Sequence, residues 1–133
     1  MSSILIVDDD ETVCSLIQEV LVQKGHACAT ASEGSAALDK IEQGRYDLVI
    51  LDHNMPKMTG TDVLKRLRDD PRHAKLPVVI CTSDALYQRK AEAGTAIGDP
   101  DGCVSKPIDL KKLVELVTML TDRTAAQRRP DKP

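Results

Sequence analysis

Short aliphatic runs recur along this chain, and polar side chains follow each of them. The junctions are residues 4–7 before Asp8-Asp9-Asp10-Glu11, residues 48–51 before Asp52, residues 78–81 before Thr82-Ser83, and residues 103–104 before Ser105-Lys106-Pro107. Runs of β-branched and aliphatic residues are typical of parallel strands that are buried on both faces. The pattern predicts a parallel sheet whose strands end in polar groups, at the edge where open α/β sheets bind ligands.

The segments between the aliphatic runs show helical spacing. A first helix is expected from Val13 through Leu21 up to Gly25. Further helices are expected over residues 36–44, 60–68 and 85–93 and after Pro107, and a strand of small residues over 27–31. Five strands that alternate with five helices predict an α/β fold with a doubly wound parallel sheet.

Length and composition limit the organisation and the partners. The 133 residues fit one domain, which we expect at residues 1–122, with a disordered polar tail at 123–133. Aromatic residues make up 2% and the formal net charge is −3, so no nucleic-acid partner is expected. No apolar stretch approaches the ~20 residues of a membrane helix, so no membrane partner is expected either.

The cysteines indicate a reducing compartment. Cys14, Cys28, Cys81 and Cys103 lack Cys-x-x-Cys spacing, and each lies in an apolar segment. We expect reduced, buried thiols of the kind found in cytosolic proteins. The first strand begins at the N-terminus and leaves no room for a signal peptide, so the expected location is the cytoplasm.

The polar ends of neighbouring parallel strands would form one cluster. Asp8, Asp9 and Asp52 would repel one another there, and a hard divalent cation would relieve that repulsion. Thr82 and Lys106 would add groups that suit phosphoryl oxygens. The Gly-x-Gly-x-x-Gly fingerprint and the Walker phosphate loop are both missing. The pattern predicts phosphoryl chemistry at a magnesium site.

These motifs resemble a known family over residues 3–121. The motifs are Asp8-Asp9, the segment Asp52-His53-Asn54-Met55-Pro56-Lys57-Met58-Thr59-Gly60, the pair Thr82-Ser83 and the pair Lys106-Pro107. In this order and at these intervals they resemble the receiver domain of two-component response regulators, of the single-domain chemotaxis-regulator type. The resemblance implies a flavodoxin-like fold with strand order 2-1-3-4-5.

The resemblance also implies roles. Asp52 would be the phosphorylation site, and Thr82 and Lys106 would be the catalytic residues that contact the phosphoryl oxygens. A cis peptide would join Lys106 to Pro107. Mg²⁺ would be the cofactor.

The implied metal ligands are oxygen atoms. Asp9 would bind Mg²⁺ directly and Asp8 through a water, while Asp52 and the backbone carbonyl of Asn54 would complete the protein ligands. The next pair, Asp10-Glu11, is expected to start a helix instead, because the helix dipole favours acids at that end.

Other positions would tune the reaction. The family places the residues that tune dephosphorylation at Asn54 and Asp84 of this chain. The switch position, which carries Tyr or Phe in many receivers, is Cys103. Tyr87 is either an ordinary half-exposed ring or a substitute reporter ring, and His53 is expected to be a loop residue rather than a catalyst.

The combined expectation is a phospho-acceptor receiver domain. In a Mg²⁺-dependent reaction, Asp52 would take a phosphoryl group from a sensor histidine kinase or a phosphotransfer protein. The fourth helix, fifth strand and fifth helix would form the switched interaction face for an unknown downstream protein. The protein would not be an enzyme, since it would catalyse only its own phosphorylation and dephosphorylation. Whether the chain is complete or belongs to a longer protein stays open.

Two alternatives come from other classes. A Mg²⁺-dependent aspartyl-phosphate phosphohydrolase would need an acid two residues after its nucleophile, where this chain has Asn54, and more length for a substrate cap. A pseudo-receiver interaction domain would be expected to lack the acidic pair, the acceptor or the lysine, and all of these are present.

Overall fold

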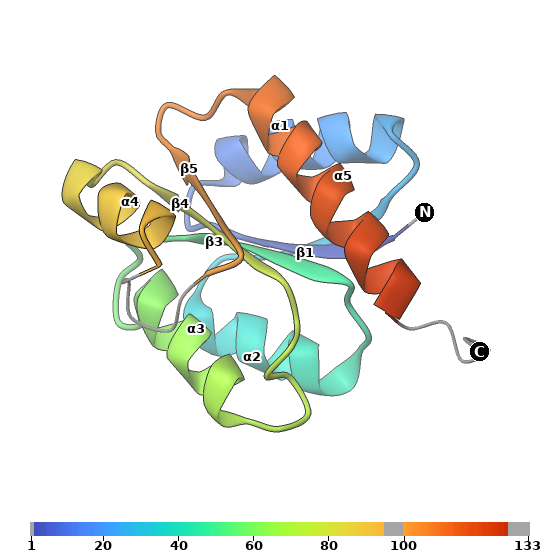
Figure 1. The fold of residues 1–133 in the computed structure, drawn as a ribbon, viewed down its shortest axis with the longest axis horizontal. Coiled ribbons are helices and arrows are strands. Elements are labelled where there is room, and N and C mark those ends of the chain that lie inside the picture. The colour runs from blue at the N-terminus through green and yellow to red at the C-terminus, as the bar shows by residue number, and fades with distance from the viewer. Residues whose placement is uncertain (1, 95–99, 128–133) are drawn as a thin grey trace.

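Strands and helices alternate along the chain (Figure 1). The computed structural model describes residues 2–94 and 100–127, with the backbone alone for residues 123–127. The elements are β1 (Ser3–Val7), α1 (Glu11–Gln23), β2 (Ala27–Ala31), α2 (Gly34–Gln43), β3 (Leu48–Asp52), α3 (Gly60–Asp69), β4 (Val78–Thr82), α4 (Ala85–Glu92), β5 (Gly102–Ser105) and α5 (Leu110–Gln127). The predicted alternation of five strands with five helices is confirmed.

All the strands are parallel and lie in the order β2-β1-β3-β4-β5, which confirms the predicted doubly wound, flavodoxin-like sheet. The register brings the strand ends level with one another: Asp52 pairs with Cys81, and Thr82 pairs with Ser105. The polar residues at and just beyond these positions therefore gather at one edge of the sheet.

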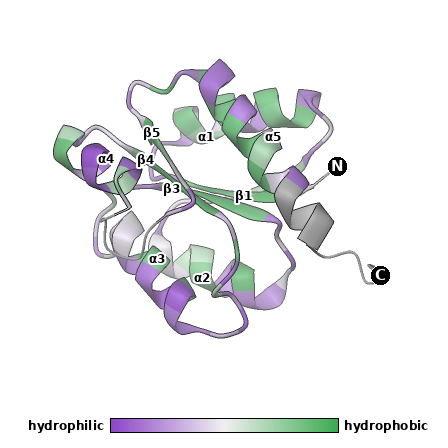
Figure 2. Cartoon of the chain, in the orientation of Figure 1, coloured by the Kyte–Doolittle hydropathy of each residue, from purple (hydrophilic) through white to green (hydrophobic). Residues whose placement is uncertain are grey.

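Aliphatic side chains form one hydrophobic cluster on each face of the sheet. Helices α1 and α5 cover one face, and α2 and α3 cover the other (Figure 1). Every residue of β3 and β4 is buried, and Figure 2 shows these hydrophobic strands between helices in which hydrophilic and hydrophobic residues alternate. Burying one such side chain fully contributes about 1.5–3 kcal/mol, so the central strands form a firm support for the polar edge.

Helix α4 is attached differently from the other helices. It has no buried residue, and most of its contacts are with β5 at the end of the sheet. Its first turn is capped by Asp84, whose side chain accepts the backbone N–H groups of Leu86 and Tyr87. Little apolar surface therefore anchors α4, and the contacts at its N-terminus add to those with β5 in holding its position.

Helix α5 continues to Gln127. The domain boundary predicted at residue 122 therefore falls inside a helix, and the predicted disordered tail is corrected at residues 123–127. The segment holds no Gly or Pro, and its two alanines have the highest helix propensity. Residues 128–133 of the predicted tail lie outside the described residues.

The cysteine side chains are free thiols. Cys14 and Cys81 are buried as expected, whereas Cys28 and Cys103 are only partly buried. Burial raises the pKa of the Cys81 thiol to about 12. Within the two described ranges, none of the helices combines the length and the apolar character that crossing a membrane requires.

Candidate functional site

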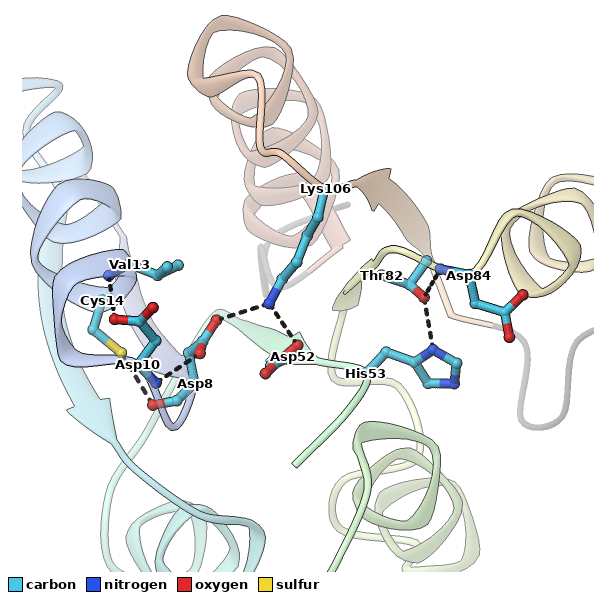
Figure 3. Close-up of polar contacts among 9 residues, drawn as sticks. All are labelled: Asp8, Asp10, Val13, Cys14, Asp52, His53, Thr82, Asp84 and Lys106. Carbon is cyan, nitrogen blue, oxygen red and sulfur yellow. Dashed lines mark hydrogen bonds and ion pairs between the residues drawn. The ribbon is translucent and has the colours of Figure 1, made fainter. Parts of the chain in front are cut away.

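A lysine and two aspartates from three different strand ends meet at the polar edge (Figure 3). Asp8 follows β1, Asp52 is the last residue of β3, and Lys106 follows β5. The Lys106 Nζ atom lies 2.8 Å from Asp52 Oδ1 and 3.5 Å from Asp8 Oδ2. Both carboxylates are only 4% exposed, so water screens them poorly and the lysine is their main counter-charge among the described residues.

The electrostatics of this cluster favour a bound cation. Burial raises the pKa of Asp8, and the nearby Asp52 charge raises it further, although the backbone N–H of Asp10 and the Lys106 ammonium oppose the change. Burial also disfavours the charged form of Lys106, but Asp52 and Asp8 outweigh it and leave its pKa raised. One ammonium therefore offsets the repulsion between the two acids only in part.

A third acid completes a set of oxygen ligands. Carboxylate oxygens of Asp8, Asp9 and Asp52 lie within 4.8 Å of one another. They line a surface pocket together with Asn54 and Lys106. Hard oxygen donors on a partly open surface fit Mg²⁺, which binds a few protein oxygens and keeps several waters.

The start of α1 holds Asp8 in place. Asp10 is the N-cap, and its side chain accepts the backbone N–H groups of Thr12 and Val13. Its own N–H donates to Asp8 Oδ1 at 2.9 Å. Asp10 and Glu11 therefore start the helix, as predicted, and the cap also orients Asp8.

The loop after Asp52 is closed by backbone contacts. The Gly60 N–H donates to the carbonyl of His53 at 3.0 Å. A Cβ atom on Gly60 would lie 2.4 Å from the Asp52 carbonyl oxygen, so this close approach requires glycine. Thr59 and Asp62 form a capping box at the start of α3. Together these contacts fix the path of the loop that presents Asn54 to the pocket.

Thr82 is nearly fully buried, and its hydroxyl contacts residues on the α4 side of the site. Its Oγ1 accepts the Asp84 N–H at 2.9 Å and lies 2.7 Å from His53 Nδ1. Figure 3 shows these contacts leading away from the contacts of Lys106 with Asp8 and Asp52. The structure thus places Thr82 at the predicted edge, with its hydroxyl hydrogen-bonded to the neighbouring loop and to His53.

The contact made by His53 was missed at the sequence level. The residue lies in the loop after β3, as expected, but its ring also stacks on Tyr87, with centroids 4.3 Å apart and planes at 27°. Tyr87 is partly buried against the cluster under α2 and α3. A histidine next to Asp52 and a tyrosine in the first turn of the fourth helix were visible signals, but no spacing rule connects them.

The residue that the resemblance places at the switch position, Cys103, lies in β5. Cys103 is partly buried, and burial raises the pKa of its thiol to about 11. It pairs with Ile80 of β4, one residue before Val104, which belongs to the cluster under α1 and α5. The peptide between Lys106 and Pro107 is cis, as the resemblance implied.

Comparisons with known proteins agree with this geometry. Residues 4–118 match the response regulator receiver domain family. The chain is 36% identical over 121 residues to the chemotaxis protein CheY of Pseudomonas aeruginosa, covering 90% of this chain and 96% of that protein. It is 33% identical to the sensor histidine kinase RcsC of Escherichia coli over 94% of this chain, but it spans only 13% of RcsC.

Solved structures show the same fold. The response regulator TrrA of Thermotoga maritima, in complex with Mg²⁺ and BeF, superimposes with a TM-score of 0.77 and 32% identity, covering 90% of this chain and 99% of that one. The receiver domain of a Francisella response regulator gives a TM-score of 0.83 with 27% identity, covering 93% of this chain and 99% of that one. The chain belongs to the response regulator receiver domain family of two-component signalling proteins.

Proposed function

We propose that Asp52 is the residue that accepts the phosphoryl group. The observation that carries this proposal is the position of Asp52, at the end of a buried strand, 2.8 Å from the Lys106 ammonium and within reach of Asp8 and Asp9. A carboxylate needs no general base to act as a nucleophile. The surrounding residues therefore need only position the donor and stabilise its charge.

The reaction follows from these groups. A carboxylate oxygen of Asp52 forms a bond to the phosphorus of a phosphohistidine while the P–N bond breaks. The imidazole leaves as a neutral group because its other nitrogen carries the proton. Lys106 stabilises charge on the phosphoryl oxygens, and Thr82 donates its hydroxyl hydrogen to one of them. Bound Mg²⁺ would supply further positive charge to the same oxygens.

The proposed metal ligands differ in their exposure and in the contacts that their oxygen atoms already make. Asp9 is exposed, and we assign it direct contact with Mg²⁺. Asp8 already accepts the Asp10 N–H on one oxygen and lies 3.5 Å from Lys106 with the other, which favours contact through a water. Asp52 and the backbone carbonyl of Asn54 would complete the set.

Asn54 and Asp84 are proposed to tune the lifetime of the aspartyl phosphate. Both are small and polar, so both leave room for an attacking water. Because the Asp84 side chain caps α4, the informative variant is Asp84→Asn, which keeps a capping oxygen and removes the charge. We expect it to change the dephosphorylation rate with Mg²⁺ affinity nearly unchanged. Equal rates for this variant, an Asn54→Ala variant and the wild type would contradict the assignment.

The partners follow from the family. We propose that a sensor histidine kinase or phosphotransfer protein supplies the phosphoryl group, and that this protein receives it in the cytoplasm. A downstream protein would then read the face formed by α4, β5 and α5. Beyond catalysing its own phosphorylation and dephosphorylation, the protein would have no enzymatic activity.

The test uses a small-molecule donor. With Mg²⁺ and acetyl phosphate, the intact mass should rise by one phosphoryl group in the wild type and not in Asp52→Asn. The control is Asp69→Asn, which removes an exposed carboxylate from a surface ion pair with Lys65. Undiminished labelling of the Asp52 variant would refute the proposal. Continuous phosphate release from small phosphomonoesters would instead support a phosphohydrolase.

A further inference from the structure

His53 links the catalytic threonine to the start of α4. One side of the link is the contact of 2.7 Å between His53 Nδ1 and Thr82 Oγ1. The other is the stack of the imidazole on Tyr87, in the first turn of the helix. Figure 3 shows the His53 ring directly below Thr82, on the side of the site away from Asp8.

The hydroxyl of Thr82 has two partners in this state. It accepts the Asp84 N–H, and it exchanges one hydrogen bond with His53 whichever imidazole tautomer is present. When His53 Nδ1 is the acceptor, the one hydroxyl hydrogen of Thr82 is donated to the imidazole, so donating it to a phosphoryl oxygen on Asp52 breaks that bond. A group on Asp52 and the imidazole therefore compete for the same hydroxyl.

The loss of that bond would reach α4 through the ring. The imidazole is held between Thr82 on one side and Tyr87 on the other. Helix α4 has no fully buried residue, and besides the ring stack it is held by β5 and by the partly buried Tyr87. When the Thr82 hydroxyl breaks its hydrogen bond to His53, the imidazole is less restrained and its stack on Tyr87 loosens. The position of the first turn of α4 then depends on the state of Thr82.

The composition of β5 increases the importance of this link. Cys103 is far smaller than an aromatic ring and cannot carry a large change of surface between two positions. Among the described residues, the ring contact nearest to Thr82 is the pair of His53 and Tyr87. A change in the position of Thr82 can therefore reach α4 through His53 and Tyr87, without a side-chain movement in β5.

We propose that His53 is a positioning residue that holds the resting rotamer of Thr82 and transmits its release to α4 through Tyr87. This inference rests on the proposed function of Asp52. It makes His53 an inhibitor of phosphoryl binding and, at the same time, a coupling element. The two roles use different parts of the side chain, so substitutions can separate them.

Two variants make that separation. His53→Phe keeps a ring for the stack on Tyr87 and loses the hydrogen bond to Thr82. His53→Asn keeps a polar group near the position of Nδ1 and loses the ring. The control is His73→Asn, which removes an imidazole between α3 and β4, at the opposite end of the strands.

The experiment is a titration of the ¹⁵N-labelled full chain with beryllofluoride in saturating Mg²⁺, followed by NMR. Beryllofluoride stands in for the phosphoryl group. His53→Phe should bind it about fivefold more tightly than the wild type, because no hydrogen bond to Thr82 has to be broken. His53→Asn should bind with wild-type affinity. In both variants the shift change at the Tyr87 amide should fall about twofold or more relative to that at Thr82.

The outcomes are distinct. A wild-type Tyr87 response in either variant would overturn the inference, as would equal affinities of the two variants. A purely structural role would change the free energy of unfolding without changing the ratio of the Tyr87 and Thr82 responses. If beryllofluoride causes no shift near Asp52 in the wild type, the proposed function fails first, and this inference fails with it.

Discussion

Replacing Lys106 with methionine should reveal how much the repulsion between the buried carboxylates of Asp8 and Asp52 destabilises the fold. Methionine keeps an unbranched apolar chain and removes the ammonium. At an effective dielectric of about 20, the contacts of 2.8 Å with Asp52 and 3.5 Å with Asp8 correspond to gross attractions of about 6 and 5 kcal/mol. Desolvation of the ammonium offsets much of that gain, and its 28% exposure adds screening. We expect a net loss of about 2–3 kcal/mol at pH 7.5 without Mg²⁺.

The pH dependence separates charge from packing. Asp8 has a raised pKa in the folded state, so its penalty is present above that pKa and disappears as the carboxyl is protonated. Removing Lys106 should raise the pKa of Asp8 further, because the ammonium is one of the groups that lower it. The destabilisation should therefore shrink as the pH falls toward about 4, near the ordinary carboxyl pKa.

Urea unfolding curves of wild type, Lys106→Met and the exposed control Lys111→Met would measure these differences. Mg²⁺ at about ten times its Kd should restore roughly 1.4 kcal/mol to any variant that still binds it. A loss of stability that is equal at pH 4 and pH 7.5 would mean that packing, not unpaired charge, explains the effect.

Further predictions concern the metal, the loop and the thiols. Asp9→Ala should weaken Mg²⁺ binding more than Asp10→Ala, because Asp10 is used as a helix cap; equal losses in calorimetry would contradict the ligand assignment. Gly60→Ala should destabilise the fold by about 3 kcal/mol or more, because its Cβ would meet the Asp52 carbonyl at 2.4 Å; an unchanged urea midpoint would show that the loop yields. Iodoacetamide at pH 8 should modify Cys81 only after unfolding, since its thiol is buried with a pKa raised to about 12; rapid labelling of the native protein would refute this.

The sheet and its polar edge were predictable because they depend on local pattern. Aliphatic runs such as residues 48–51 are typical of buried parallel strands, and the register of such strands aligns whatever follows them. Asp8, Asp52 and Lys106 could therefore be expected to meet, although they are far apart in the sequence, and the structure brings them together.

Other features depend on tertiary contacts or weak local preferences. The stack of His53 on Tyr87 requires the loop after β3 and the first turn of α4 to approach each other, and nothing in either segment alone indicates this. The side chain of Asp101 accepts the Val78 N–H and pairs with Arg68, two contacts that no local pattern indicates. The boundary of the domain was placed at residue 122, before the end of α5, because a polar surface helix and a polar tail have similar compositions.

The scarcity of aromatic side chains gives this chain a built-in optical reporter. It has no Trp or Phe and two Tyr residues. Tyr46 lies before β3, beside Gly44, whereas Tyr87 lies at the other end of the strands, under the His53 ring. Near-ultraviolet absorption, emission and dichroism therefore come from one ring close to the site and one remote from it. A Tyr46→Leu variant would leave Tyr87 as the one remaining tyrosine, so that the response to Mg²⁺ and acetyl phosphate could be followed in unlabelled protein.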